Sequence, residues 1–204
     1  MSEELPLQGS PRGARRRRGS GKRPPPPISE EDFLRAAERH LERYPTSVAG
    51  LRRVLERRAH RSRLHHDRLH HDRLHHSEAT EDTEAIIQAT LDRMLSLNLL
   101  DDERYGRALT RRLRARGGSL SRIEARLHEK GIPPPLRDEL LNEVSGPEAE
   151  LAAADRYSRK RRLGHHRPDP ERRREMRQRD LAALARAGFP FEIATRALEG
   201  ESAS

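Results

Sequence analysis

The 204-residue chain contains no cysteine, and aromatic side chains make up only 3% of it. The lack of cysteine excludes a disulfide framework, a zinc–thiolate site and thiol catalysis. Hydrophobic residues amount to 32%, too few for one large core. No apolar run approaches the roughly 20 residues of a membrane-spanning helix, and no apolar segment follows the basic N-terminus as in a secretory signal. We therefore expect a soluble, cytoplasmic protein without membrane contact.

Charge is what the chain has in abundance: 37% of its residues are charged, with a formal net charge of +9. Such a surplus of positive charge favours a polyanionic partner: nucleic acid, an acidic protein groove or anionic lipid. Residues 1–27 include Arg15–Arg18 and Pro24–Pro27 and have almost nothing apolar to bury. This composition predicts a disordered basic arm. The arm suits either contact with phosphates or simple solubilisation, and the sequence leaves both roles open.

Three short helices are predicted between residues 97 and 144 from the spacing of apolar residues. The first places four of them on one face: Tyr105, Ala108, Leu109 and Leu113. Gly117 and Gly118 end that helix, and the second carries its own face: Leu120, Ile123 and Leu127. Ser121 with Glu124 matches a capping box, and Gly131 with Ile132 matches a Schellman ending. After Pro133–Pro135 a third stripe follows: Leu136, Leu140, Leu141 and Val144.

The same pattern occurs earlier in the chain. A shift of 72 residues overlays two helices and their connection. The aligned pairs in the first helix are Phe33 with Tyr105, Ala36 with Ala108, Ala37 with Leu109 and Leu41 with Leu113. The pairs in the connection and the second helix are Ser47 with Ser119, Val48 with Leu120, Leu51 with Ile123 and Leu55 with Leu127. The third helix of this earlier copy needs a shift of 50, which places Ile86, Leu91 and Met94 on Leu136, Leu141 and Val144. One shift that aligns two helices and their connection indicates a repeat.

The difference between the two shifts, 72 − 50 = 22 residues, predicts an insertion at about residues 59–81. It contains the pentads RLHHD, RLHHD and RLHHS from Arg63 to Ser77. Pairs of histidines four apart in a helix suit a metal ion. A five-residue period nevertheless rotates around a helix, so no single face collects these histidines. We therefore interpret the insertion as a solvated extension of the second helix or its loop, and we predict no metal ligands and no cofactor.

A third copy begins near Pro147, with Ala149, Ala153 and Tyr157 on its first helix. Its end repeats the central unit at a shift of 57, which places Leu184, Gly188, Phe189, Ile193 and Leu198 on Leu127, Gly131, Ile132, Leu136 and Leu141. Upstream the match decays, because Asp180 takes the place of Ile123 and Leu181 is the nearest apolar substitute.

The predicted fold class is all-α, with tandem three-helix repeats forming an elongated curved array. The predicted boundaries are 28–97, 98–145 and 146–200, after the disordered arm at 1–27 and before a frayed tail at 201–204. We expect neighbouring repeats to share a core that none sustains alone.

The order and spacing of these residues resemble the RecX family of recombinase regulators. The resemblance covers roughly residues 28–200 and is densest from Leu97 to Ile132, with the signature residues Leu99, Leu100, Asp101, Asp102, Tyr105, Gly118, Leu127, Lys130, Gly131, Ile132, Gly188 and Phe189. Three features depart from the family pattern: Gly106 in place of the usual Ala, the pentad insertion and the long basic arm.

The resemblance implies a non-enzymatic regulator that lies along the groove of the RecA–DNA filament. Such a protein inhibits the ATPase, strand-exchange and co-protease activities of RecA. We expect this chain to act as a monomer, with contacts from exposed arginines of the two best-defined helices: Arg107, Arg111, Arg112, Arg114, Arg116, Arg122 and Arg126. Each is equally consistent with a merely solvated face.

The alternative is a helical protein that binds DNA weakly and without sequence specificity, since helix–turn–helix units rich in arginine suit phosphate contact. No helix offers an obvious base-reading face, and the aromatic residues are too few for stacking on single strands. An enzyme is disfavoured, because the sequence has no Gly-rich cofactor loop and no carboxylate–histidine set of defined spacing. Asp101 and Asp102 are better explained as an acidic pair at a helix N-terminus.

Overall fold

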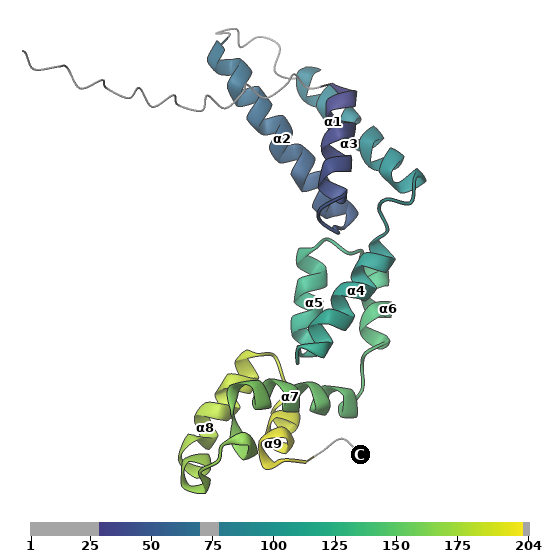
Figure 1. Cartoon of the computed structure of the whole chain (residues 1–204). Coiled ribbons are helices and arrows are strands. Elements are labelled where there is room, and N and C mark those ends of the chain that lie inside the picture. Colours follow the sequence, from purple (N-terminus) through teal and green to yellow (C-terminus); the bar gives the residue numbers. More distant parts are fainter. Residues whose placement is uncertain (1–28, 70–77, 202–204) are drawn as a thin grey trace, which may run out of the picture.

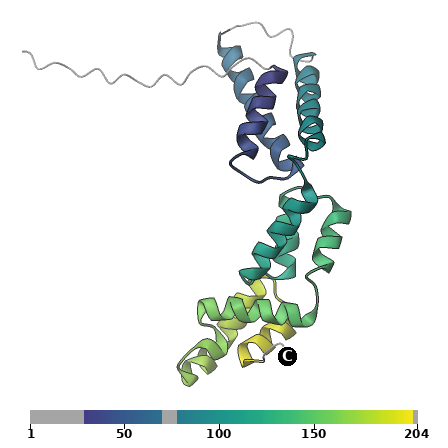
Figure 2. The ribbon, with the colours of Figure 1, turned by 45° about the vertical axis from the view of Figure 1, so that its right-hand side comes forward.

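The computed structural model describes residues 29–69 and 78–201. In these ranges all regular structure is helical, which confirms the predicted all-α class. The predicted basic arm, residues 70–77 of the pentad segment and residues 202–204 lie outside the described residues. The helices follow one another in three groups along an elongated, curved shape (Figures 1 and 2).

Unit 1 consists of α1 (Glu30–Leu41), α2 (Val48–Leu69) and α3 (Glu78–Ser96). Ser29 caps α1, because its hydroxyl accepts a hydrogen bond from the Asp32 backbone N–H at 3.2 Å. The apolar faces of the three helices meet in one core, formed by Phe33, Ala37, Leu51, Leu55, Ala59, Ile87, Leu91, Met94 and Leu100.

Unit 2 consists of α4 (Asp102–Ala115), α5 (Leu120–Glu129) and α6 (Pro134–Asn142). Its core is smaller and contains Leu109, Ile123, Leu127, Ile132 and Leu140. Gly106 is buried against this core, and a Cβ atom there would lie 2.5 Å from the Leu140 Cδ1 atom. The glycine at this position therefore leaves room for the Leu140 side chain.

The N-cap of α5 differs from the sequence-based prediction. The predicted capping box of Ser121 and Glu124 is wrong, because the helix already begins at Leu120. Ser119 is the N-cap instead, and its hydroxyl accepts the Arg122 N–H at 3.2 Å. Ser119 is fully buried, whereas Ser121 is exposed.

Unit 3 consists of α7 (Pro147–Arg161), the short 3₁₀ helix η1 (Gly164–His166), α8 (Pro170–Arg186) and α9 (Phe191–Glu199). Its core is the largest of the three and contains Leu151, Ala153, Ala154, Leu163, Leu181, Leu184, Ala187, Phe189, Ile193, Ala194, Ala197 and Leu198.

Asp180, which replaces the apolar Ile123 of unit 2 in the repeat, is buried in unit 3 and is paired there. Its carboxylate accepts two hydrogen bonds from Arg167, at 2.9 and 2.7 Å, and one from the Gly164 N–H at 2.9 Å. Burial raises the pKa of Asp180, but these hydrogen bonds and the Arg167 charge outweigh burial and leave the pKa below its usual value. The adjacent Leu181 is buried in the core, as expected from the sequence.

The burial pattern of unit 2 repeats that of unit 1 at the shift of 72 residues. Positions 37 and 109, 47 and 119, 51 and 123, and 55 and 127 are buried in both copies. One predicted core residue is misplaced: Ala108 is exposed, because it lies on the outer side of α4. The buried serines at this repeated position, Ser47 and Ser119, each lie where one unit meets the next.

The expectation of a core shared between neighbouring units is wrong. The buried apolar residues in the described part of the chain form three separate clusters, one within each unit. Each three-helix group buries its own apolar faces, and hydrogen bonds link the units, as from Ser47 to the Lys130 carbonyl and from Ser119 to the Ala187 carbonyl. This arrangement differs from a solenoid whose repeats stack through one continuous core.

The predicted insertion lengthens helices in unit 1. α2 has 22 residues, against 10 for its counterpart α5, and α3 has 19, against 9 for α6. Ala59 and Ser62, at the start of the predicted insertion, are buried, so the lengthened part of α2 begins inside the packed unit. The side chains of the six pentad histidines, between residues 65 and 76, lie outside the described residues, so the metal interpretation of the pentads is not tested. No helix in the ranges 29–69 and 78–201 is both long and apolar enough to cross a membrane.

Candidate partner-binding face and the joints between units

The same serine position joins each unit to the next. At joint 1, between units 1 and 2, the Ser47 hydroxyl donates to the Lys130 carbonyl at 2.5 Å. At joint 2, between units 2 and 3, the Ser119 hydroxyl donates to the Ala187 carbonyl at 2.6 Å. Each hydroxyl also accepts an N–H from the first turn of its own helix, at 3.0 Å from Gly50 and 3.2 Å from Arg122. One buried hydroxyl thus caps a helix and ties it to the following unit.

A carboxylate from the following unit supplies a second repeated contact. Asp102 of α4 accepts the Val48 N–H at 2.8 Å, and Glu150 of α7 accepts the equivalent Leu120 N–H at 3.2 Å. A carboxylate suits this place, because the first turn of a helix has unpaired N–H groups and a partial positive charge. Burial is the main reason why the pKa of Asp102 lies above its usual value, with the Val48 N–H opposing it and Asp101 adding to it. Asp101 itself caps α4 by accepting the Arg104 N–H at 2.8 Å.

Glycines with positive φ complete both joints. Gly131 has φ +74°, and a Cβ atom there would lie 2.4 Å from the Ala49 Cβ. Gly188 has φ +87°, and its Cβ would lie 3.2 Å from the Cβ of Ser121, the residue equivalent to Ala49. The left-handed backbone and the close approach of the preceding unit therefore both require glycine.

We expect the substitution Gly131→Ala to lower the melting temperature by more than backbone strain alone explains. The left-handed backbone costs an alanine about 1–2 kcal/mol, and contact with the Ala49 methyl adds to it. The control is the double variant Ala49→Gly/Gly131→Ala, analysed as a double-mutant cycle by thermal unfolding. A favourable coupling between the two changes is predicted. Strictly additive effects would show that the units do not meet at Gly131.

Joint 2 contains in addition a buried ion pair. The Arg114 Nη1 lies 2.5 Å from the Glu150 Oε2 and 3.0 Å from the Gly118 carbonyl, and Nη2 lies 2.8 Å from the Val144 carbonyl. The Arg114 residue is only 8% exposed. The prediction that Arg114 lies on the exposed face is therefore wrong, because this side chain turns toward α7 and fills the joint.

The remaining predicted arginines do lie on the outside of α4 and α5. Arg111, Arg112, Arg116, Arg122 and Arg126 are exposed, and Arg107 is partly buried. Within the described part of the chain, no ion pair is made by Arg111, Arg112, Arg116 or Arg122. The charges of these four arginines are free for an anionic partner. The charges of Arg107 and Arg126 are partly compensated by acidic neighbours.

Arg107 and Arg126 have acidic neighbours. Arg107 bonds to Glu143 and Glu103, each at 2.7 Å, and these bonds hold its pKa above the usual value. The side chain of Arg126 pairs with Glu129, and this hydrogen bond holds the pKa of Glu129 below its usual value. These two arginines are therefore weaker candidates for a partner contact than the unpaired four.

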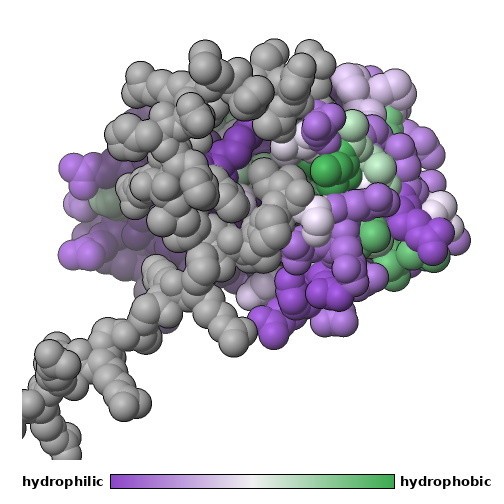
Figure 3. Space-filling model, turned by 90° about the horizontal axis from the view of Figure 1, so that it is seen from above, coloured by the Kyte–Doolittle hydropathy of each residue, from purple (hydrophilic) through white to green (hydrophobic). Residues whose placement is uncertain are grey.

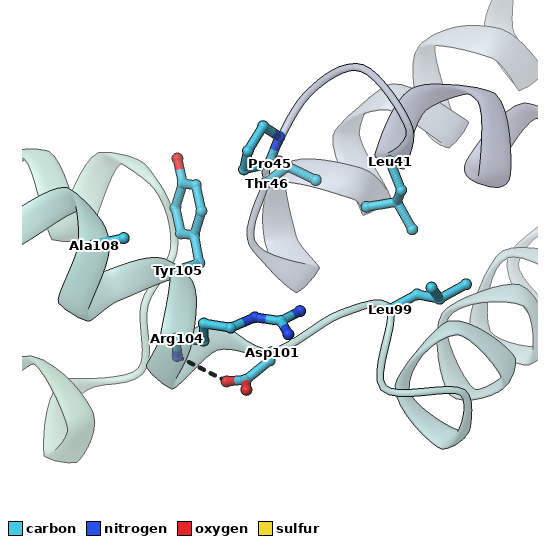
Figure 4. Close-up of a pocket in the computed structure, with 8 residues that line it drawn as sticks. All are labelled: Leu41, Pro45, Thr46, Leu99, Asp101, Arg104, Tyr105 and Ala108. Carbon is cyan, nitrogen blue, oxygen red and sulfur yellow. Dashed lines mark hydrogen bonds between the residues drawn. The ribbon is translucent and has the colours of Figure 1, made fainter.

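A pocket of about 330 Å³ opens beside this face, at joint 1. Apolar atoms from both units line it, and the Arg104 side chain extends into the same space (Figure 4). The lining residues are Leu41, Pro45, Thr46, Leu99, Asp101, Arg104, Tyr105 and Ala108. Leu99 is 46% exposed, although the sequence pattern places it in a leucine-rich helix end.

Tyr105 connects the pocket with the arginine face. Burial raises the pKa of the Tyr105 hydroxyl, and the charges of Arg112 and Arg126 act against that rise. Both arginines are thus close enough to influence the ring that lines the pocket. We define the candidate site as this joint pocket together with the exposed arginines of α4 and α5.

The residues of the sequence signature build the fold more than they build this site. Four are buried in cores: Leu100, Leu127, Ile132 and Phe189. Asp102, Gly131 and Gly188 lie at the joints, and Asp101 caps a helix. Gly118 is buried beside Leu113, and of the motif residues only Leu99, Asp101 and Tyr105 line the pocket.

Sequence reasoning missed the contacts between units that Ser47, Glu150 and Gly117 make. Gly117 has φ +80°, and its Cβ would lie 2.8 Å from the Tyr157 backbone nitrogen in α7. The recurrence of serine at positions 47 and 119 was a usable signal, but a serine before a helix already has an explanation as a cap. Sequence reasoning also passed over Asp155, His165 and His166, which the structure brings together.

Fold and surface together define an all-helical repeat protein with a basic outer face. In the coloured part of the surface seen from the unit 1 end, hydrophilic residues predominate and hydrophobic residues lie scattered between them (Figure 3). The large apolar residues that are exposed in the described part of the chain are Tyr44, Leu64, Leu95, Leu97, Leu99 and Phe191. A surface of this kind suits contact with another charged macromolecule better than a small-molecule site.

Comparison with known proteins gives the family. The chain is 34% identical over 193 residues to the Regulatory protein RecX of Myxococcus xanthus (strain DK1622), covering 94% of this chain and 97% of the relative. It is 28% identical over 114 residues to the Regulatory protein RecX of Trichlorobacter lovleyi, covering 55% of this chain and 72% of the relative. No family model matches.

A crystal structure of a regulatory protein RecX has the same fold, with a TM-score of 0.54 and 22% identity, over 82% of this chain and 72% of that one. The chain belongs to the RecX family of regulatory proteins.

Proposed function

We propose that the protein binds in the groove of the RecA–DNA filament and inhibits the ATPase, strand-exchange and co-protease activities of the recombinase. Its near full-length similarity to a protein named Regulatory protein RecX carries this proposal. In this role the protein is a cytoplasmic, non-catalytic monomer. It acts by occupying a surface of the filament.

The shape and charge of the molecule support the proposal. The three units form an elongated curve rather than one compact bundle (Figure 1), and such a curve suits a long helical groove. The unpaired arginines of unit 2 face outward, and a filament that carries DNA offers phosphates and acidic side chains. The joint pocket adds an apolar contact beside this charged face.

The direct test is the ATPase activity of RecA on single-stranded DNA with the protein added below the stoichiometry that saturates the filament. We predict inhibition that persists at salt concentrations where the protein no longer binds naked DNA. Phosphate contacts weaken steeply with salt, so weak DNA binding is lost first. Inhibition that disappears together with naked-DNA binding would favour the alternative, a non-specific DNA-binding protein.

Charge reversal on the arginine face should weaken inhibition strongly. In the triple variant Arg111→Glu/Arg112→Glu/Arg116→Glu we expect the concentration for half-inhibition of the RecA ATPase to rise by at least about tenfold, because attraction becomes repulsion. The matched control changes three exposed arginines of α8 in the same way: Arg172, Arg174 and Arg179. The net charge changes equally in both variants, so equal loss of inhibition would argue against a defined face.

A further inference from the structure

Three metal-ligating side chains meet in unit 3, outside the proposed RecA-binding face. Asp155 comes from α7, and His165 and His166 come from η1. One ligand atom from each lies within 4.8 Å of the other two. The Asp155 Oδ1 lies 3.6 Å from the His165 Nε2 and 2.7 Å from the His166 Nε2, and the two imidazole centroids are 3.7 Å apart.

The structure holds His165 with its Nε2 atom toward Asp155. Its Nδ1 lies 3.1 Å from the Ala197 carbonyl, which can only accept, so Nδ1 carries the proton and Nε2 keeps its lone pair in the neutral ring. Such a bond from the second ring nitrogen to a carbonyl typically orients metal-ligating histidines. Gly200 packs on the ring, because a Cβ atom at this glycine would lie 3.2 Å from the His165 Cγ.

The position of η1 is fixed as well. Gly164 has φ +51°, and a Cβ there would lie 2.6 Å from the Leu198 Cα atom, so η1 lies directly against α9. The Gly164 N–H also donates to the buried Asp180 at 2.9 Å. Both histidines are partly buried, with side chains 32% and 16% exposed. The two rings are thus presented by a held segment rather than by a free loop.

Asp155 is oriented through its other oxygen. Its Oδ2 accepts a hydrogen bond from the Arg159 Nη2 at 2.9 Å, while Oδ1 faces the two histidines. The Arg159 side chain is 70% exposed, and its hydrogen bond goes to Oδ2 and not to the oxygen that faces the histidines. Oδ1 is therefore the atom available to a cation.

We propose that Asp155, His165 and His166 form a zinc-binding site. Two imidazole nitrogens and a carboxylate oxygen are ligands that Zn²⁺ accepts, with water in the fourth position. Zinc–ligand distances of about 2.0–2.1 Å place tetrahedral ligand atoms about 3.3 Å apart. The distance of 3.6 Å between the Asp155 Oδ1 and the His165 Nε2 is close to this value. The distance of 2.7 Å between the Asp155 Oδ1 and the His166 Nε2 has to lengthen when the ion binds. The ion would tie α7 to η1, and through His165 to the end of α9.

A single Asp–His hydrogen bond explains less of this arrangement. It accounts for His166, but it leaves the His165 ring close to a second imidazole, at a tilt of 43°, with the His165 lone pair toward the same Asp155 oxygen. Binding of Zn²⁺ to the two Nε2 atoms satisfies both rings at once. The site is independent of RecA binding, and its test does not involve the recombinase.

The test uses the full chain with the six pentad histidines (residues 65, 66, 70, 71, 75 and 76) changed to glutamine, so that they cannot bind zinc. Zinc chloride is titrated in competition with a chromophoric chelator. We expect one ion per chain and a rise of the melting temperature, since zinc stabilises the folded state that presents the site. In His166→Gln and Asp155→Asn the affinity should fall by more than about tenfold, because even second-shell changes typically cost 10- to 100-fold.

Arg159→Gln is the matched control, because it removes only the Oδ2 partner of Asp155. Its zinc affinity should stay much closer to that of the parent than the affinities of the ligand variants. A second measurement needs no variant at the site: the imidazole NMR signals of His165 and His166 should shift together on addition of one equivalent of zinc. Absence of zinc binding, unchanged affinity in both ligand variants or unshifted imidazole signals would overturn the proposal.

Discussion

Replacement of Arg114 by alanine is expected to destabilise joint 2 by about 3–5 kcal/mol, the range for breaking a buried ion pair. The loss is large because Glu150 would remain buried, at 5% exposure, without its partner at 2.5 Å. The carbonyls of Gly118 and Val144 would lose a donor as well. Thermal or denaturant unfolding measures the effect, which should appear as a lower melting temperature of units 2 and 3.

The double variant Arg114→Met/Glu150→Met is the control for this prediction. Because it removes both charges and keeps much of the volume, it should recover most of the lost stability. Full recovery is not expected, since Glu150 also accepts the Leu120 N–H. A double variant as unstable as Arg114→Ala would show that lost packing, and not an unpaired charge, dominates at this joint.

Leu109→Asp is expected to unfold unit 2 while units 1 and 3 keep their helices. The change removes a leucine that is 4% exposed and puts a carboxylate in its place, which costs more than about 4 kcal/mol. The core of unit 2 contains only five buried apolar residues, so unit 2 has little stability beyond what this change removes. Hydrogen exchange followed by mass spectrometry should show lost protection across α4–α6 and retained protection elsewhere, because the three cores are separate.

Ala108→Asp is the matched control for this second prediction. It adds the same charge one residue earlier, on the exposed side of the same helix. Surface changes of this kind typically alter stability by less than about 0.5 kcal/mol. Equal effects of the two changes would mean that α4 is not packed through Leu109. Unfolding of all three units by Leu109→Asp would mean that they form one cooperative structure.

Helical periodicity was sufficient to predict the all-α class and most of the buried positions. Phe33, Leu51, Ile123 and Leu184 recur at helical spacing, and all of them are buried. Apolar residues are informative in this way because their burial is driven by water and needs no particular partner. The glycine of the helix ending at Gly131 was predictable for a similar reason, since its left-handed backbone is a local property.

Contacts between units were not predictable from such local signals. Arg114 was expected to be exposed, because an arginine on a highly charged helix is usually solvated. Its burial is favourable only because Glu150, which is distant in the sequence, forms an ion pair with it. Ser47 and Ser119 have local explanations as helix caps, which conceal their second hydrogen bonds to Lys130 and Ala187. The separate cores were missed for the same reason, because a repeat period does not show whether apolar faces meet within a unit or between units.

The most direct test of the proposed RecA contact is a hydrogen-exchange footprint of the protein on the RecA–single-stranded DNA filament, at a salt concentration that abolishes binding to naked DNA. We predict new protection in α4 and α5 and in the segment around Leu99 at joint 1, with α8 unchanged. Protection confined to α8, or none within the ranges 29–69 and 78–201, would contradict binding through this face.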